Sequence, residues 1–315
     1  MIVLVVVGCE IEFCNDYTKS NTMPWLETSR LKFHYREWGD DDGVPLLLLH
    51  GSHASSLWWQ PFCAILPDSI HALAPDLRGC GLSSRSERGY EIEEQAADVF
   101  GLVDGLRLTE FDLVGHGSGG AIAIEFALRH RKRVHSLILV DSVPIEGAFT
   151  PLEGLQVLAQ MREDRALLRR ALASLMPAVP PPTMSPAEFE VYFESIVEDA
   201  AGMAPAAFTA VAEALTRWNR QEEARGLTLP TLVVQGSDDI IVDKEAATRS
   251  LLSIPGAANL EVLRGVGHSP MVEAPVTLAE RIIAFITEDF DSFEEARDFA
   301  EARGQRGEGS GVLDS

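Results

Sequence analysis

The chain has 315 residues with 26 basic and 48 acidic side chains, which gives a formal net charge of −22 at pH 7. A surface this negative repels nucleic-acid phosphates and anionic lipid head groups, which argues against nucleic acid or a membrane as a partner. Hydrophobic residues make up 46% of the chain, which excludes a disordered or fibrous protein and favours a packed core. The length suits one large domain or two small ones.

The cysteines and glycines give no sign of a metal or a cofactor. Cys9, Cys14, Cys63 and Cys80 lack the paired spacing of a zinc site or a disulfide framework, so we expect no metal and a reducing, cytoplasmic setting. The glycines between positions 115 and 120 are only superficially similar to a dinucleotide-binding loop, because no acidic residue ends a following strand at the expected distance. We therefore expect no cofactor.

Both ends of the chain differ in composition from the rest. Residues 1–22 begin with the apolar run Ile2–Val7, which is too short for the core of a secretion signal and has no basic residue before it. We interpret residues 1–22 as an N-terminal extension that the fold does not need, with Met23 as an alternative start. Residues 288–315 mix acidic residues with glycines, and we expect a mobile acidic tail in which Phe293–Arg303 can form a short helix.

Between these ends, short apolar runs bounded by turn residues predict strands buried on both faces. In chain order, these runs are Pro45–Leu49, His71–Ala74, Phe111–Val114, Leu137–Val140, Thr231–Val234 and Leu260–Leu263, and before them the alternating segment Leu31–Trp38 predicts a further strand. Helical stretches lie between them, for example at Glu94–Leu106 and Ala121–Arg129. Strands that alternate with helices predict an α/β fold with a doubly wound, mostly parallel sheet.

The alternation of strands and helices breaks once, over residues 144–226, where helix-forming residues dominate and Pro180–Pro182 separates two helical halves. In open α/β sheets, ligands bind at the carboxyl ends of the strands. We therefore interpret residues 144–226 as a helical lid inserted into a core of residues 23–143 and 227–287. A helical subdomain with no functional role is the alternative.

Five motifs in order resemble those of the α/β-hydrolase superfamily, in particular its lidded esterase, lactonase and C–C hydrolase branch. The motifs are His50–Ser52, Pro75–Ser83, the strand-to-helix junction Leu113–Ala121, Gly236–Asp239 and Gly267–Pro275. Together they cover about residues 31 to 286. The resemblance implies the superfamily's fold and a catalytic series of nucleophile, acid and histidine in chain order.

The nucleophile position departs from the pattern of the superfamily. When the motif is aligned on its flanking glycines, Gly117 occupies the slot in which the G-x-S-x-G elbow carries its serine. Glycine adopts this strained turn without the cost of about 1 to 3 kcal/mol that other residues have, so the turn should form without its attacking oxygen. Ser118 is then either a displaced nucleophile or a helix-start serine whose backbone N–H forms the oxyanion hole with that of Ser52.

The resemblance implies that Asp239 and His268 complete the series. Asp239 would orient the imidazole of His268, which would act as a general base; a turn residue is the plain alternative for Asp239. Asp141, at the end of the preceding strand, is the alternative acid.

Further residues near the motifs are candidates for the substrate pocket: Gly51, His53, Trp58 and His116. A surface or capping role is as plausible for His53, and we expect His116 to support the elbow from behind. We expect Trp58 and Trp59 to pack against the sheet. The apolar lid side chains Leu158, Met161, Phe189, Phe193 and Trp218 would form the core of the lid first and the wall of the pocket second.

These residues predict a hydrolase of small or medium apolar esters, lactones or related acyl compounds. In it, His268 and Asp239 would activate water or a displaced Ser118. The alternative is a catalytically impaired or non-hydrolytic member of the superfamily, a ligand-binding protein or a lyase, that retains the pocket.

Overall fold

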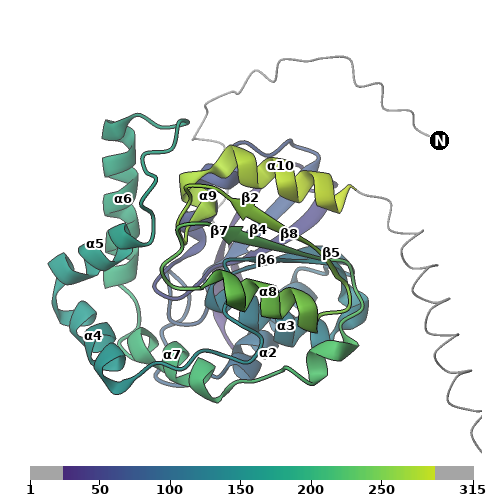
Figure 1. Ribbon diagram of the computed structural model, residues 1–315, viewed down its shortest axis with the longest axis horizontal. Coiled ribbons are helices and arrows are strands. Elements are labelled where there is room, and N and C mark those ends of the chain that lie inside the picture. Colours follow the sequence, from purple (N-terminus) through teal and green to yellow (C-terminus); the bar gives the residue numbers. More distant parts are fainter. Residues whose placement is uncertain (1–23, 288–315) are drawn as a thin grey trace, which may run out of the picture.

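An eight-stranded sheet forms the centre of the protein in the computed structural model, which describes residues 24–287 (Figure 1). The strands are β1 (Trp25–Glu27), β2 (Lys32–Trp38), β3 (Val44–Leu49), β4 (Ile70–Pro75), β5 (Phe111–His116), β6 (Val134–Val140), β7 (Thr231–Gly236) and β8 (Ala257–Leu263). Their order is β1-β2-β4-β3-β5-β6-β7-β8. The pairs β1/β2 and β2/β4 are antiparallel and the other pairs are parallel. The predicted doubly wound, mostly parallel sheet is confirmed.

Each continuous apolar run lies within a strand of the sheet, and the predicted segment Leu31–Trp38 contains β2, which begins at Lys32. Every residue of β4, β5 and β7 is buried, which explains why these strands appear in the sequence as continuous apolar runs. Two details differ from the prediction. The three-residue strand β1 is too short to leave a pattern, and β6 begins three residues before the predicted run, at Val134, which pairs with Phe111 of β5.

Helices cover both faces of the sheet (Figure 1). On one face lie α1 (Gln60–Cys63), α9 (Pro270–Glu273) and α10 (Pro275–Ile286); on the other lie α2 (Ile92–Gly105), α3 (Ser118–Arg129) and α8 (Lys244–Ser253). Short 3-10 turns lie at Ser56–Trp59, Arg131–Arg133 and Glu223–Gly226. Within residues 24–287, none of the helices has both the length and the apolar character that crossing a bilayer requires.

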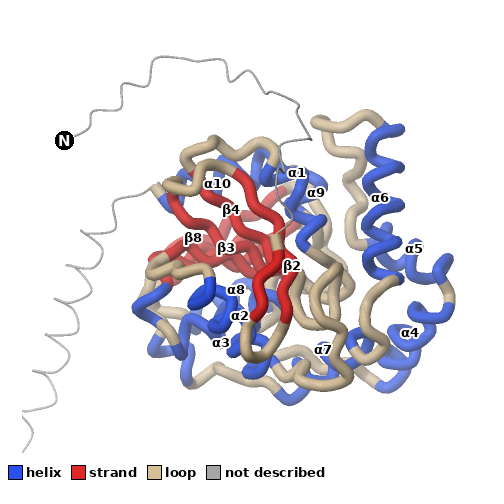
Figure 2. Tube along the Cα trace, turned by 180° about the vertical axis from the view of Figure 1, so that it is seen from behind, coloured by secondary structure: helices blue, strands red, loops and turns tan. Residues whose placement is uncertain are grey.

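The segment between β6 and β7 forms a helical insert, defined here as residues 144–226. It contains α4 (Leu152–Glu163), α5 (Arg165–Ser174), α6 (Pro186–Ala201) and α7 (Ala207–Arg217). Figure 2 shows α4, α5 and α6 projecting beyond one side of the sheet. The start of α6 is fixed by a capping box, in which Ser185 and Glu188 each accept a hydrogen bond from the backbone N–H of the other.

The predicted N-terminal extension, residues 1–22, and the predicted acidic tail, residues 288–315, lie outside the described residues.

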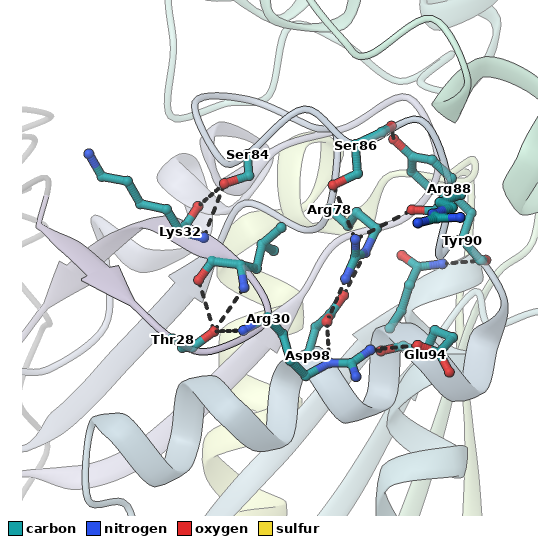
Figure 3. Close-up of polar contacts among 12 residues, drawn as sticks. Thr28, Arg30, Lys32, Arg78, Ser84, Ser86, Arg88, Tyr90, Glu94 and Asp98 are labelled. Carbon is teal, nitrogen blue, oxygen red and sulfur yellow. Dashed lines mark hydrogen bonds and ion pairs between the residues drawn. The ribbon is translucent and has the colours of Figure 1, made fainter.

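A buried carboxylate on α2 joins two loops that are far apart in the sequence (Figure 3). Asp98 accepts a hydrogen bond from Nε of Arg30 at 2.8 Å and two from the guanidinium of Arg78 at 2.7 Å each. Arg30 lies between β1 and β2, and Arg78 follows β4. The Asp98 side chain is 2% exposed, so the two guanidinium groups take the place of water as its hydrogen-bond partners.

We predict that Asp98→Ala lowers the free energy of unfolding by about 3 kcal/mol, because it leaves the two guanidinium groups without their shared buried partner. Glu94→Ala is the matched control: Glu94 also pairs with Arg30, but its side chain is 52% exposed, and we expect a loss below about 1 kcal/mol. Urea denaturation of both variants measures the difference. Equal losses would contradict the central role of Asp98.

Candidate active site

The candidate site lies where the strand order reverses. Strand β3 lies between β4 and β5, and Leu49 pairs with Gly115, so the loops that follow β3 and β5 meet at the carboxyl edge of the sheet. Ligands bind at such switch points in open α/β sheets. The loops after β7 and β8 reach the same edge and bring Asp239 and His268 to it.

A cavity of about 490 Å³ opens at this edge. Its polar end includes Ser52, His53, Gly117, Ser118 and His268. The insert supplies most of the remaining wall, which is largely apolar: Ala148, Val157, Leu158, Met161, Ala171, Leu172, Leu175, Phe208, Val211, Ala212 and Leu215. The structure therefore places five of the predicted site residues around one apolar space.

The elbow forms at Gly117. This residue has φ 54° and ψ −122°, a conformation that is costly for any residue with a side chain. Its N–H donates to the Val140 carbonyl, and its own carbonyl accepts from the N–H groups of Gly120 and Val143, each at 3.1 Å. A β-carbon built on Gly117 would lie 3.3 Å from Nε2 of His268. The backbone thus presents position 117 to the histidine, although no side chain is there.

Asp239 and His268 form a close pair. Oδ2 of Asp239 lies 2.8 Å from Nδ1 of His268, and Oδ1 accepts from the N–H groups of Ile241 and Val242. Burial alone would raise the pKa of Asp239, but the hydrogen bond and charge of His268 and the two N–H groups hold that pKa below its ordinary value. An ionised Asp239 accepts a hydrogen bond from Nδ1–H of His268, and in this tautomer the lone pair of the imidazole is on Nε2, the atom facing Gly117.

Asp141 occupies a different place. Its side chain is fully buried beside Asp239, and Oδ1 accepts the N–H of Gly236 at 2.8 Å. Burial and the negative charge of Asp239 raise the pKa of Asp141 well above its usual range. Since the hydrogen bond from His268 goes to Asp239, the geometry favours Asp239 over Asp141 as the acid.

Glu273 holds the histidine loop and was missed in the sequence analysis. Its buried carboxylate accepts the N–H groups of Gly267 and Ser269, which flank His268, at 3.0 Å each. It also accepts the N–H of Ala178 in the insert at 2.9 Å. The sequence does contain a sign of this role: Glu273 is a carboxylate within the apolar stretch after His268. A carboxylate buried in such a stretch needs several hydrogen-bond donors.

The opposite side of the site is built by the loop after β3. Nε2 of His50 accepts the N–H of Leu77 at 2.9 Å, so its Nδ1–H donates to the Gly51 carbonyl at 2.8 Å and fixes the loop. The hydroxyl oxygens of Ser52 and Ser118 lie 2.9 Å apart and share a hydrogen bond. Among residues 24–287, no hydrogen bond joins Ser118 to His268.

Three of the predicted pocket residues are not among those that line the cavity: Gly51, Trp58 and His116. His116 donates from Nε2 to the carbonyl oxygen of His268 at 2.7 Å, and Trp58 stacks on the His116 ring. Burial and the neighbouring His268 lower the pKa of His116 to about 3, so it is neutral. Trp58 and Trp59 are both buried. His116 and Trp58 therefore support His268 from outside the cavity, whereas Gly51 lies beside the elbow, with its Cα 3.6 Å from a β-carbon built on Gly117.

The predicted apolar side chains of the insert divide into two groups. Leu158 and Met161 line the cavity. Phe189, Phe193 and Trp218 are buried but are not part of the cavity wall. The division follows the elements: the first two residues lie on α4, whereas the two phenylalanines lie on α6.

His53 does line the cavity and connects it to the insert. Its Nε2 lies 3.2 Å from the carbonyl oxygen of Phe208 on α7, and its backbone has φ 59°. Burial lowers the pKa of His53 to about 4, so the side chain is neutral at pH 7.

Potential metal ligands group at one place within residues 24–287, at Glu37, Asp41 and His71. His71 stands near the start of β4, at the end of the sheet opposite to the candidate site. The group therefore contributes nothing to the chemistry of the cavity.

Known proteins with similar sequences and folds support the resemblance. Residues 46–281 match the model of the alpha/beta hydrolase family. A 2-hydroxymuconate semialdehyde hydrolase of Pseudomonas sp. (strain CF600) is 28% identical over 78% of this chain and 88% of that protein. A haloalkane dehalogenase 2 of Mycobacterium bovis is 30% identical over 82% of this chain and 93% of that protein. The enol-lactonase of Burkholderia xenovorans LB400 has a similar fold, with a TM-score of 0.72 and 21% identity over 84% of this chain and all of that one.

The burial of His53 predicts a loss of stability in acid. Because its folded pKa of about 4 is below its unfolded value, the stability it contributes is complete above about pH 6.5 and is lost as the pH falls toward 4. Between pH 7 and pH 5, we expect this residue to account for about 2 kcal/mol of the loss in unfolding free energy. Urea denaturation of the parent and of His53→Gln at both pH values measures it. The same loss in both proteins would contradict the prediction.

Proposed function

The chain belongs to the alpha/beta hydrolase family, and from this premise we propose that it hydrolyses small or medium apolar esters, lactones or related acyl compounds. The observation that carries the proposal is the His268–Asp239 pair, whose free Nε2 faces an elbow that has no side chain. The nucleophile in this proposal is a water molecule that Nε2 deprotonates, because Ser118 has no hydrogen bond to His268 within the described residues.

The proposed reaction has two steps. His268 takes a proton from the water at Nε2 while the water oxygen bonds to the acyl carbon, and ionised Asp239 stabilises the imidazolium that forms. The acyl oxygen becomes negative beside the backbone N–H groups of Ser52 and Ser118. The tetrahedral intermediate then breaks its bond to the leaving oxygen, which takes the proton back from Nε2.

The walls of the cavity support an apolar substrate. The insert contributes mainly aliphatic side chains and Phe208, and its helices would act as the lid over the site. A bulky charged group would lose its hydration in this space without gaining a paired charge. The acyl part of the substrate is therefore uncharged in this proposal.

The expected rate is modest. Serine hydrolases that lose a member of the catalytic triad still accelerate hydrolysis about 10³ to 10⁴ fold over water, through the oxyanion hole and substrate binding. This protein would work in that range, with the addition of a positioned general base. The alternative function, a ligand-binding protein or a lyase that keeps the pocket, would give no ester hydrolysis above the background rate.

We predict that the purified protein hydrolyses p-nitrophenyl butyrate slowly and that His268→Ala lowers kcat at least about 100-fold, since the general base is lost. His130→Ala, beyond the end of α3 and outside the cavity, is the control and should keep the parent rate. A parent protein as inert as His268→Ala on a panel of esters and lactones would exclude the proposal.

Restoring a hydroxyl at the elbow gives a second prediction. Gly117→Ser should raise the rate of ester hydrolysis at least about 10-fold, because its Oγ would be within reach of Nε2 of His268. It should also lower the free energy of unfolding by about 1 to 3 kcal/mol through backbone strain.

Gly117→Ala is the matched control for this variant, because it carries the same strain without the oxygen. We expect it to be destabilised as much as Gly117→Ser and to gain no activity. If both variants gain activity equally, or if neither is destabilised, the elbow geometry described here is wrong.

A further inference from the structure

The hydroxyl groups of Ser52 and Ser118 form a pair at the polar end of the cavity. Ser52 lies in the loop after β3, and Ser118 is the first residue of α3, so two separate elements bring the oxygens to 2.9 Å. Both residues line the cavity, and Ser118 is only 6% exposed. The family's oxyanion hole needs only the backbone N–H at these two positions, so the hydroxyl pair is an additional feature.

Counting protons shows that the pair is incomplete without a ligand. Each hydroxyl has one proton and can also accept a hydrogen bond, and the shared bond uses one of the two protons. Whichever serine donates in that bond, one O–H is left over. In the part of the chain that the structure describes, no other protein atom accepts it. Its acceptor is then an oxygen that enters the cavity, from water or from a ligand.

The unused O–H lies near the place where the acyl oxygen of the substrate would become negative. It lies beside the first N–H groups of α3, a twelve-residue helix whose N-terminal end favours negative charge. Position 117, where the attacking atom would be held near Nε2 of His268, directly precedes Ser118. An acyl carbon attacked there would place its oxygen close to the serine pair.

We propose that the Ser52–Ser118 pair supplies a third donor of the oxyanion hole: the O–H that is not used within the pair donates to the acyl oxygen as it becomes negative. In this role Ser118 and Ser52 are catalytic through their hydroxyl groups, and neither forms a covalent bond to the substrate. The inference deepens the proposed hydrolytic function and rests on it. The substrates of that function are compounds with an acyl oxygen, the atom that would accept this hydrogen bond as it becomes negative.

The same geometry argues against Ser118 as the nucleophile. A serine attacks only when a base takes its proton, and the base of this site is Nε2 of His268. The hydroxyl of Ser118 is engaged with Ser52 instead. The two roles of Ser118 can be told apart by experiment. They differ in the activity expected of Ser118→Thr, in the binding of transition-state analogues and in the labelling by reagents that react with nucleophilic serines.

The test compares Ser118→Ala, Ser118→Thr and Ser52→Ala in the hydrolysis of p-nitrophenyl butyrate. We expect Ser118→Ala to lower kcat about 10- to 100-fold with KM within about twofold, because the donor acts on the transition state. Ser118→Thr keeps the hydroxyl and should stay within about threefold of the parent. Ser52→Ala should lose less than Ser118→Ala, because Ser52 donates within the pair and the unused O–H is that of Ser118.

The control is Ser142→Ala. Ser142 is buried outside the cavity, and its hydroxyl already donates to the Val143 carbonyl at 3.0 Å. The Ser142→Ala variant should hydrolyse p-nitrophenyl butyrate at the rate of the parent. Circular dichroism of each variant confirms that the fold is kept.

A second measurement does not depend on turnover. A trifluoromethyl alkyl ketone is hydrated in water and carries oxygens like those of the tetrahedral intermediate. Calorimetry should show that Ser118→Ala binds 1,1,1-trifluoro-2-hexanone at least about 10-fold more weakly than the parent and Ser118→Thr do. If the parent hydrolyses no ester but this difference in affinity is found, the hydrolytic function fails and the donor role stands.

Three results would overturn the inference. Equal kcat and equal ketone affinity for Ser118→Ala and the parent would show that the hydroxyl contributes nothing. Equal losses for Ser118→Ala and Ser118→Thr would show that only the shape of the side chain matters. Covalent labelling of Ser118 in the parent by a fluorophosphonate would show that it is a nucleophile.

Discussion

The hydrogen bond between Asp239 and His268 is the interaction on which the chemistry of this site depends. It holds the imidazole in the form with its lone pair on Nε2, and it aims that atom at the elbow. Much of the surrounding structure holds this pair in place. Glu273 fixes both N–H groups next to His268, and the carbonyl oxygen of Leu175 in the insert accepts the N–H of His268 itself. The insert therefore contributes to the geometry of the base as well as to the wall of the cavity.

Gly117 changes the chemistry without changing the fold. The turn keeps the positive φ and the backbone hydrogen bonds of an elbow, and glycine gives this conformation at low cost. In the proposed reaction the covalent step is absent, and attack comes from a water molecule that Nε2 of His268 deprotonates. In this proposal the oxyanion hole supplies the larger part of the rate acceleration, and the hydroxyl groups of Ser52 and Ser118 add a donor to it.

The sequence predicts most of the sheet because its central strands are buried on both faces and leave continuous apolar runs. It also predicts the order Gly117, Asp239 and His268, because those residues stand in recognisable turns after strands. Contacts between distant segments leave no such trace. Three hydrogen bonds of the site join residues far apart in the sequence. The separation is 66 residues for Ser52 and Ser118, 155 for His53 and Phe208, and 95 for Ala178 and Glu273. These contacts depend on how the loops and the insert pack, which local patterns do not record.

The most direct test of the central claim is the mass of the protein during turnover. If water attacks the substrate directly, the protein never carries an acyl group. Samples of the parent protein would be mixed with an excess of p-nitrophenyl butyrate, quenched in acid within milliseconds to seconds, and weighed intact by mass spectrometry, with Gly117→Ser as the positive control. Direct attack by water predicts an unmodified mass for the parent at every time point while nitrophenol is released. A butyryl adduct on the parent, located at Ser118, would contradict it.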